Sequence, residues 1–383
     1  MKNILLIAPS DPQDFSAGGS QRTNFLYEAL CRQGRVYTII PVGAPFLEKR
    51  DPIRNIAWVS PMRRYSPAWI LDRLLSRQVS FLHYPSKGIL PQLERLWPGV
   101  KFDYTICRYA TWAVYTRAWQ VAPLLLDVDD LPEESFQTIY AARCRIPVFW
   151  RNLVRHWQRA ILRKAAGLWI ANAEQVPFLP PIPKGWLPNL PREPKLKYLP
   201  SDCTRRQIIS VGYLGYQSNY EGIDLFLNEV WPELHQNYPE LHYRIIGREL
   251  PLRFQEKWSQ YPNVDILGFV DDLEEEYRNA LFSVAPIYSG SGTCIKVLES
   301  LRMGRVCLCT PFAVRGLNGS KLLHNGLLVA GNADEFLKGA GFLLENESER
   351  HRLENAGIVT VQAEFNFKLF VESVEALIRA VGH

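Results

Sequence analysis

Two patterns of apolar residues alternate along this chain. Short apolar runs of strand length are followed by longer stretches in which apolar residues recur at helical spacing. The strand-like runs are NILLIAP, VYTIIPV, YTIC, PLLLDVDD and LWIANA in the first half, then IISVGYLG, LHYRIIG, NVDILGFV, FSVAPIY, VCLCTP and GLLVA in the second. This alternation predicts βαβ units built around parallel sheets.

A proline-rich segment, VPFLPPIPKGWLPNLPREPKLKYLP, separates the two halves, and 383 residues exceed the usual size of one core. We therefore predict an α/β protein with two Rossmann-like, doubly wound domains, residues 1–190 and 191–366. A terminal helix at 367–383 is expected to pack back toward the first domain. Open parallel sheets bind ligands at the carboxyl ends of their strands, so we expect the two domains to face each other across a cleft.

The composition excludes several classes of protein. Apolar residues make up 47% of the chain and charged residues 22%, which is a globular and not a disordered balance. The apolar run at the N-terminus is too short for a signal peptide, and no run of about 18 apolar residues predicts a membrane span. The 7 cysteines form no CxxC pair and no zinc-ligand spacing with histidine. We therefore expect a cytoplasmic protein.

The net charge of +5 conceals an asymmetry between the halves. Residues 1–190 hold 24 Lys+Arg and 14 Asp+Glu, whereas residues 191–383 hold 20 and 25. The halves therefore carry about +10 and −5. Such a division predicts that the first half meets an anionic partner, such as a membrane surface or a phosphate-bearing acceptor.

Residues 284–317 carry the most informative chemistry. A strand runs into Ser289, Gly290, Ser291, Gly292 and Thr293, after which a helix begins. The free N–H groups at a helix start favour an anion, and phosphate fits such a loop. One turn later Lys296 can neutralise a diphosphate, and Glu299 can accept hydrogen bonds from a ribose diol. The alternative is an ordinary strand-to-helix turn followed by a solvated Lys–Glu pair.

The segment GSGTCIKVLESLRMGRVCLCTPFAVRGL resembles the donor-binding part of glycosyltransferase family 4, whose members have the GT-B fold. The similarity extends upstream and covers nearly all of residues 207–330. It implies a retaining glycosyltransferase that uses a nucleotide-diphosphate sugar and a glycan or lipid-linked acceptor. By resemblance, Gly290–Thr293 and Lys296 would hold the diphosphate and Glu299 the ribose. Phe269, Val270 and Asp271 would border the base, and Arg248 is a second phosphate candidate.

One position departs from the family pattern. Many members carry a carboxylate eight positions before the residue that matches Glu299, where it contacts the donor sugar, and this chain has Ser291 there. Two alternatives therefore stay open. One is a nucleotide-sugar epimerase of the same fold, and the other is a catalytically silent binding subunit.

The first domain has two candidate features. Gly18 and Gly19 lie in a loop before its first predicted helix. The family resemblance places this loop across the cleft from the diphosphate. The alternative is an ordinary turn between a strand and a helix. The strand PLLLDVDD ends in carboxylates, of which Asp129 and Asp130 are catalytic candidates that would bind sugar hydroxyls or stabilise developing positive charge. A DxD pattern also suits a divalent metal or a helix cap. By resemblance, we expect no required metal and no other cofactor.

An arginine-rich helix is predicted at residues 149–165. Its arginines recur every four residues on the side opposite its aromatic and aliphatic residues. Such a face is either merely solvated or rests on anionic lipid, which Arg63, Arg64, Arg73 and Arg77 would reinforce. The sequence has no base-stacking motif, so we expect no nucleic-acid partner. The predicted lipid-facing side chains are Arg151, Arg155, Arg159 and Arg163.

Overall fold

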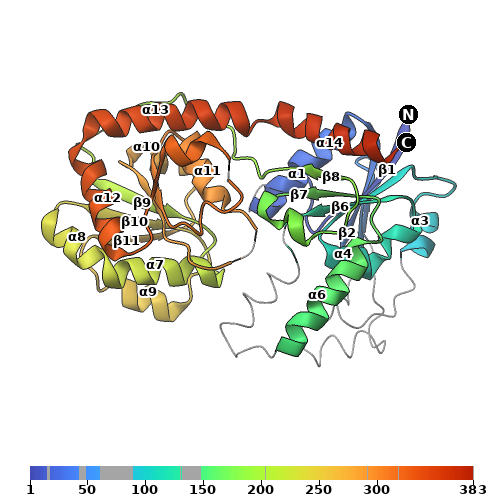
Figure 1. Cartoon of the computed structure of the whole chain (residues 1–383), viewed down its shortest axis with the longest axis horizontal. Coiled ribbons are helices and arrows are strands. Elements are labelled where there is room, and N and C mark those ends of the chain that lie inside the picture. Colours follow the sequence, from blue (N-terminus) through green and yellow to red (C-terminus); the bar gives the residue numbers. More distant parts are fainter. Residues whose placement is uncertain are drawn as a thin grey trace. The chain divides into compact units, whose positions relative to one another are not determined.

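The computed structural model describes residues 1–14, 18–42, 49–60, 89–129, 131, 148–202, 204–290, 292–317 and 319–382. The chain forms two compact units. Unit 1 consists of Met1–Pro188 and Phe367–His383, and unit 2 of Asn189–Asn366. The boundary lies two residues before the predicted one, and the last helix belongs to unit 1. Each unit contains a sheet flanked by helices (Figure 1).

The sheet of unit 1 has eight strands in the order β3-β4-β2-β1-β5-β6-β7-β8. All neighbouring strands are parallel except β3 and β4. The strands are β1 Lys2–Ile7, β2 Gly34–Pro41, β3 Lys49–Asp51, β4 Ile56–Val59, β5 Tyr104–Arg108, β6 Leu124–Val128, β7 Gly167–Ile170 and β8 Lys184–Trp186. The helices of this unit are α1 Gly18–Cys31, α3 Leu90–Leu96, α4 Ala110–Thr116, α6 Val148–Leu162 and α14 Phe367–Val381.

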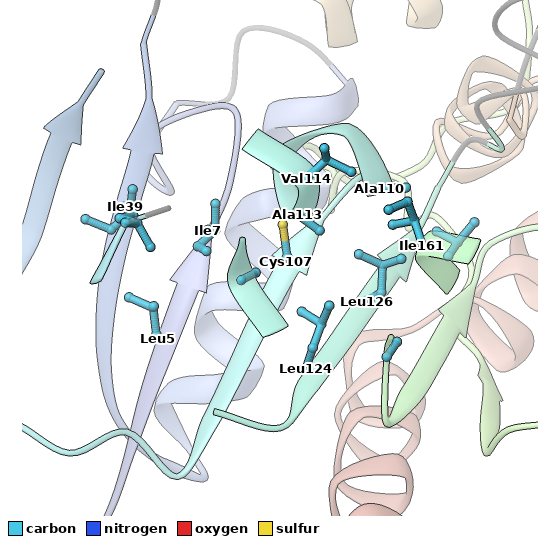
Figure 2. Packing of buried hydrophobic residues seen from close by; sticks show 14 of the residues in the cluster. Leu5, Ile7, Ile39, Cys107, Ala110, Ala113, Val114, Leu124, Leu126 and Ile161 are labelled. Atoms are coloured by element: carbon cyan, nitrogen blue, oxygen red, sulfur yellow. The ribbon is translucent and has the colours of Figure 1, made fainter. Parts of the chain in front are cut away.

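The core of unit 1 explains why the sequences of its strands are continuous apolar runs. Leu5 and Ile7 of β1 are fully buried on the face that α4 and α6 cover (Figure 2). Ile4 and Leu6, which alternate with them along the strand, are equally inaccessible. Burial on both faces is the usual state of parallel sheets, and each buried aliphatic side chain contributes about 1.5–3 kcal/mol.

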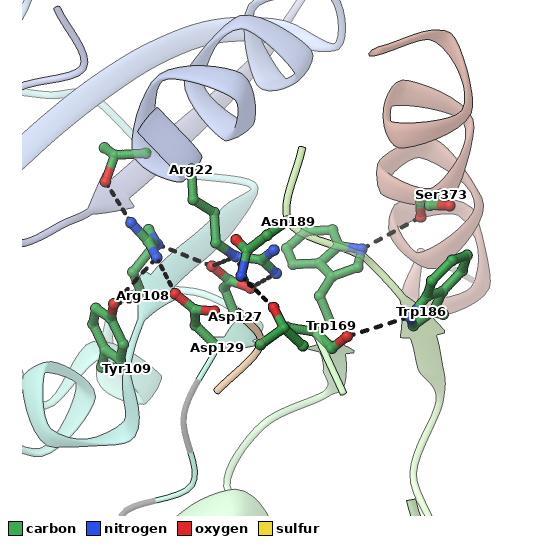
Figure 3. Close-up of polar contacts among 12 residues, drawn as sticks. Arg22, Arg108, Tyr109, Asp127, Asp129, Trp169, Trp186, Asn189 and Ser373 are labelled. Atoms are coloured by element: carbon green, nitrogen blue, oxygen red, sulfur yellow. Dashed lines mark hydrogen bonds and ion pairs between the residues drawn. The ribbon is translucent and has the colours of Figure 1, made fainter. Parts of the chain in front are cut away.

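Helix α14 anchors the end of the chain to unit 1. Its Phe367 and Phe370 pack against Phe25 of α1, with ring centroids 5.9 and 6.2 Å away. The indole of Trp169 on β7 donates a hydrogen bond to the carbonyl of Ser373 at 3.3 Å (Figure 3). The last helix therefore completes the first unit, although unit 2 precedes it in the sequence.

The sheet of unit 2 has six parallel strands in the order β11-β10-β9-β12-β13-β14. The strands are β9 Gln207–Val211, β10 His242–Ile246, β11 Val264–Gly268, β12 Ser283–Ala285, β13 Cys307–Cys309 and β14 Leu327–Val329. The helices are α7 Gln217–Glu229, α8 Trp231–Asn237, α9 Leu252–Trp258, α10 Leu273–Asn279, α11 Ile295–Arg302, α12 Ala333–Glu345 and α13 Glu347–Glu364. Ile208 and Ile209 of β9 enter different clusters, so helices cover both faces.

The predicted class, an α/β protein with two doubly wound parallel sheets, is confirmed. One detail differs from the prediction, because the proline-rich segment is not wholly a linker. Its residues Lys184–Trp186 form the edge strand β8, which pairs with β7. None of the helices in the described ranges is both long enough and apolar enough to span a bilayer.

Candidate functional site

The predicted binding residues of unit 2 gather at one edge of its sheet. Arg248 follows β10, Phe269 follows β11, and the loop at 286–294 follows β12. These strands and β9 are neighbours in the sheet, and all run in the same direction. Their carboxyl ends therefore meet, and this is where open α/β sheets bind ligands.

The glycine loop between β12 and α11 adopts a backbone that other residues rarely take. Gly290 has a φ of 137° and Gly292 a φ of 70°. Arg315 supports the loop by donating from Nη2 to the carbonyl of Gly292 at 3.0 Å. Asn189 donates to the hydroxyl of Thr293 at 2.7 Å. Ser291 lies outside the described residues.

At the amino end of α11, Cys294 occupies the capping position, and its side chain makes no capping hydrogen bond. The first N–H groups of a helix have no partner within the helix, and an anion can satisfy them. The loop and the start of α11 therefore lie together, and their role in binding phosphate stays a prediction.

Lys296 lies beside the end of β9. Its ammonium donates to Oδ1 of Asn219, and Nδ2 of Asn219 donates to the carbonyl of Tyr213 at 2.7 Å. A Cβ on Gly212 would lie 3.2 Å from Nζ of Lys296, so a side chain there would crowd the ammonium. Gly212 and Asn219 were not predicted from the sequence. The small residue that follows a buried strand, in SVG, was the available signal for Gly212.

Glu299 lies one turn after Lys296 and is half-buried. Burial raises the pKa of its carboxyl group, and the charges of Arg192 and Lys296 lower that pKa in part. A partly desolvated carboxylate binds hydroxyl groups more strongly than a hydrated one, because it has lost water partners. Its position and environment suit the recognition of a diol.

Arg248 and Phe269 form a cation–π pair, with the guanidinium carbon 5.1 Å from the ring centroid. Phe269 is 65% exposed, although a large apolar side chain is usually covered. Val270 is half-buried and Asp271 is exposed on the same loop. This part of the sheet edge therefore offers an aromatic surface and a cation, at the residues that the family resemblance assigns to the nucleotide base.

Unit 1 has its own cluster of polar residues at the carboxyl ends of β1, β5 and β6. Gly18 and Gly19 begin α1 after β1, Arg108 ends β5 and Tyr109 follows it. Asp127 lies on β6, and Asp129 follows that strand. Strand β1 has β2 on one side and β5 on the other, which makes this the switch point of the sheet.

The cluster is a buried network of charges (Figure 3). Arg22 donates to Asp127 from Nε at 3.0 Å and from Nη2 at 2.5 Å. Arg108 donates to the same carboxylate from Nε at 2.9 Å. Burial by itself raises the pKa of Asp127, but the two arginines outweigh that effect and hold the pKa below its usual range. Asp127 therefore has a structural role, and it is fully buried.

Asp129 is the carboxylate of this network that reaches the surface. It accepts from Nη2 of Arg108 at 3.0 Å and from the hydroxyl of Tyr109 at 3.2 Å, and its side chain is 11% exposed. The predicted catalytic residue Asp130 lies outside the described residues. Arg108 and Tyr109 were not predicted, because nothing in the run CRYA indicates that it meets Asp129.

The predicted amphipathic helix is present as α6, which ends at Leu162, three residues before the predicted end, so Arg163 lies in the turn that follows it. Arg155, Arg159 and Arg163 are exposed, whereas Ile161 and Leu162 are buried against unit 1. The side chain of Arg151 lies outside the described residues, as do Arg63, Arg64, Arg73 and Arg77. The periodic pattern thus gives an exposed arginine surface and a buried apolar one.

Known proteins resemble this chain in sequence and in structure. Residues 205–346 match the family model described as Glycosyl transferases group 1. No curated protein matches the sequence. Sucrose-phosphate synthase from Thermosynechococcus elongatus has a similar structure, with a TM-score of 0.72 and 15% identity over 100% of this chain and 99% of that one.

Two further solved structures contain nucleotides. HepE from Anabaena in complex with UDP has a TM-score of 0.65 and 10% identity, over 99% of this chain and 100% of that one. The structure described as trehalose-6-phosphate from E. coli bound with UDP-2-fluoro glucose has a TM-score of 0.65 and 12% identity, over 100% and 99%. The chain has the GT-B fold. The predicted resemblance to the group 1 glycosyltransferases is confirmed, and the family match lies within unit 2, where the glycine loop, Lys296 and Glu299 occur.

Proposed function

We propose that this protein is a retaining glycosyltransferase that moves a hexose from a nucleotide-diphosphate sugar to a glycan or lipid-linked acceptor. The observation that carries the proposal is the meeting of the glycine loop, the uncapped start of α11 and the Lys296 ammonium at one sheet edge. The group 1 family match covers all three features.

Some of the site residues stabilise charge on the leaving group, and others position the donor. In the transfer, the bond from the anomeric carbon to the diphosphate breaks, and its electron pair leaves with the diphosphate. The acceptor oxygen forms the new bond on the same face, and its proton passes to the departing phosphate oxygen. Lys296, Arg248 and the N–H groups at Gly292 and Thr293 stabilise the charge that develops on the leaving group. Glu299 holds the ribose.

Uridine diphosphate is the first nucleotide to test, because UDP or a UDP-sugar occupies two of the structural neighbours. We propose that no metal is required, since Lys296, Arg248 and the helix start supply positive charge. In unit 1, Asp129 and the loop at Gly18 and Gly19 would contact the acceptor or the reacting sugar. Asp130 stays a candidate for the same role.

The acceptor and the location of the protein belong to the same proposal. The exposed arginines of α6 would rest on anionic lipid at the inner face of the membrane, where a lipid-linked acceptor is available. Synthesis of a cell-surface polysaccharide or lipopolysaccharide fits this arrangement. The protein would then be a cytoplasmic enzyme with a peripheral membrane contact.

The deciding experiment is thermal stabilisation by a panel of nucleoside diphosphates and nucleotide sugars, with and without magnesium. A ligand at 100 times its dissociation constant adds about 2.7 kcal/mol of stability. We expect stabilisation by one nucleotide, without magnesium, that Glu299→Ala abolishes. No stabilisation by any nucleotide would contradict the transferase.

The same experiment separates the two alternatives once a nucleotide sugar binds. Conversion of the donor sugar without an acceptor would indicate an epimerase. Binding without any turnover, across a panel of acceptors, would indicate a silent subunit, for which Ser291 in the carboxylate position is the main argument.

A further inference from the structure

Among the described residues, the buried network of unit 1 holds equal numbers of positive and negative charges. It contains two arginines, Arg22 and Arg108, and two aspartates, Asp127 and Asp129. Both arginines are almost fully buried, at 2% and 0% exposure. The charges of these four side chains therefore cancel within the network.

Arg108 has no N–H group left for a ligand. Its Nε donates to Asp127, and its Nη1 donates to the carbonyl of Gly19 and to Thr23. Its Nη2 donates to Asp129 at 3.0 Å and to the hydroxyl of Tyr109 at 3.4 Å. A guanidinium carries five N–H donors, and all five have acceptors here. Arg108 thus orients its neighbours and is not a phosphate ligand.

Tyr109 has an unusual backbone for its residue type. Its φ is 66° and its ψ 134°, at the residue where β5 ends and α4 begins. Non-glycine residues avoid positive φ, and such strain concentrates at binding sites. The conformation places the hydroxyl on Asp129, and that hydroxyl is 3.7 Å from the point where a Cβ on Gly19 would lie.

We propose that Tyr109 and Asp129 form a binding site for an uncharged hydroxyl of the acceptor, with Gly19 at the start of α1 as its wall. The inference rests on the proposed transferase function and specifies its acceptor. The Asp129 carboxylate accepts a hydrogen bond from the acceptor hydroxyl, and the Tyr109 phenol fixes the direction of that carboxylate. The half-buried ring of Tyr109 also provides an apolar surface for the C–H face of a sugar.

This site selects against charge. A phosphate or carboxylate at Asp129 would meet a like charge in a place where Arg22 and Arg108 are already paired. A phosphate of a lipid-linked acceptor must therefore bind elsewhere on the protein. The reacting end of the acceptor is a neutral sugar or polyol, and not a phosphorylated one.

The test uses the full chain and two matched pairs of probes, methyl α-glucoside against glucose 6-phosphate and glycerol against glycerol 3-phosphate. Binding is measured by saturation-transfer NMR with saturating UDP present. We expect the neutral member of at least one pair to bind at least tenfold more tightly than its phosphorylated partner. Tyr109→Phe keeps the ring but removes the hydroxyl that orients the Asp129 carboxylate, and it should weaken that binding about tenfold.

Tyr104→Phe is the matched control, because Tyr104 is a buried tyrosine at the opposite end of β5. It should leave binding of the neutral probe unchanged. If transfer to the neutral probe is measurable, Tyr109→Phe should raise its KM without changing the KM of the donor. A merely structural role would alter both constants or neither.

The outcomes distinguish this inference from the proposed function. Tighter binding of the phosphorylated probes, equal binding by Tyr109→Phe, or no binding of a neutral probe while UDP binds would each overturn the acceptor site and leave the donor site intact. Failure of UDP and every other nucleotide to bind would instead contradict the proposed function.

Discussion

Arg22 makes a two-point contact with Asp127, from Nε at 3.0 Å and from Nη2 at 2.5 Å, between side chains that are 1% and 0% exposed. The contact joins the first helix of unit 1 to the middle of its sheet. Arg108 also donates a hydrogen bond to this carboxylate, so the charge of Asp127 is shared between two buried cations. Its loss would leave both of them without that partner.

Asp127→Asn should therefore destabilise the protein by about 3–5 kcal/mol, the usual cost of removing one partner from a buried pair. Urea denaturation of the full chain, followed by tryptophan fluorescence, measures this change. Glu240→Gln is the control, because its ion pair with Arg206 is 3.8 Å long and exposed. That variant should lose no more than about 1 kcal/mol. Equal losses in the two variants would contradict a special role for Asp127.

The same carboxylate predicts a pH dependence. The pKa of Asp127 is lower in the folded protein than in the unfolded chain, where it is about 3.9. Its stabilising effect is therefore complete above that value and is lost as the pH falls below it. The difference in unfolding free energy between the wild type and Asp127→Asn should be constant from about pH 5 to 7 and shrink below about pH 4. A difference that grows on acidification would contradict this assignment.

Lys296→Ala should weaken binding of the nucleoside diphosphate by about 10–100-fold, which corresponds to one charge-assisted hydrogen bond. Its fold should survive, since the hydrogen bond that Lys296 makes is to the neutral Asn219 side chain. Calorimetric titration with UDP measures the affinity, and Lys338→Ala on the exposed face of α12 is the control. Melting of Lys296→Ala with unchanged affinity of the folded fraction would exclude Lys296 from the site.

Much of the proposed donor site could be predicted because its parts are contiguous in sequence. Gly290, Gly292, Lys296 and Glu299 belong to one loop and one helix, whose periodicity indicates which side chains share a face. Asn219 could not be predicted in the same way, because it meets Lys296 across 77 residues. Pairing between strands β9 and β12 brings the two together, and local patterns carry no information on such pairing.

The polar cluster of unit 1 was even less predictable from the sequence. The apolar runs predict β5 and β6 but not that they are neighbours, so the contact between Arg108 and Asp127 was not predictable. The three-residue strands β3 and β8 were not predicted, because they are short, carry no apolar run and lie at the sheet edges. Long buried strands have a clear apolar pattern, whereas edge strands depend on the neighbour with which they pair.

Glu299→Gln should have opposite effects on stability and on binding. The pKa of Glu299 is raised by burial, so its ionised form is disfavoured in the folded protein. Stability of the wild type relative to the variant should therefore fall as the pH rises from the unfolded value of about 4.3 through the folded pKa. Glu299→Gln should be the more stable protein at pH 7 and yet bind nucleotide about tenfold more weakly.

Thermal melts and UDP titrations from about pH 4 to 8 measure both effects of Glu299→Gln. In the wild type, UDP affinity should also decline as Glu299 becomes protonated at low pH, whereas the variant should lack that component. A variant that is less stable at pH 7 but binds UDP normally would make Glu299 a structural residue.

The exposed face of α6 gives the last prediction. Replacing Arg155, Arg159 and Arg163 by glutamine removes three cations, each of which contributes about 1 kcal/mol near an anionic surface. Binding to vesicles with about 30% phosphatidylglycerol should weaken by about 100-fold, as measured by co-sedimentation at low salt. The control replaces Arg205, Lys338 and Arg352, which are equally exposed on unit 2, and changes the net charge by the same amount. A specific arginine surface loses vesicle affinity only when its own cations are removed. An equal loss of vesicle binding in the two triple variants would therefore mean that the net charge of the protein, and not the α6 surface, governs the attraction.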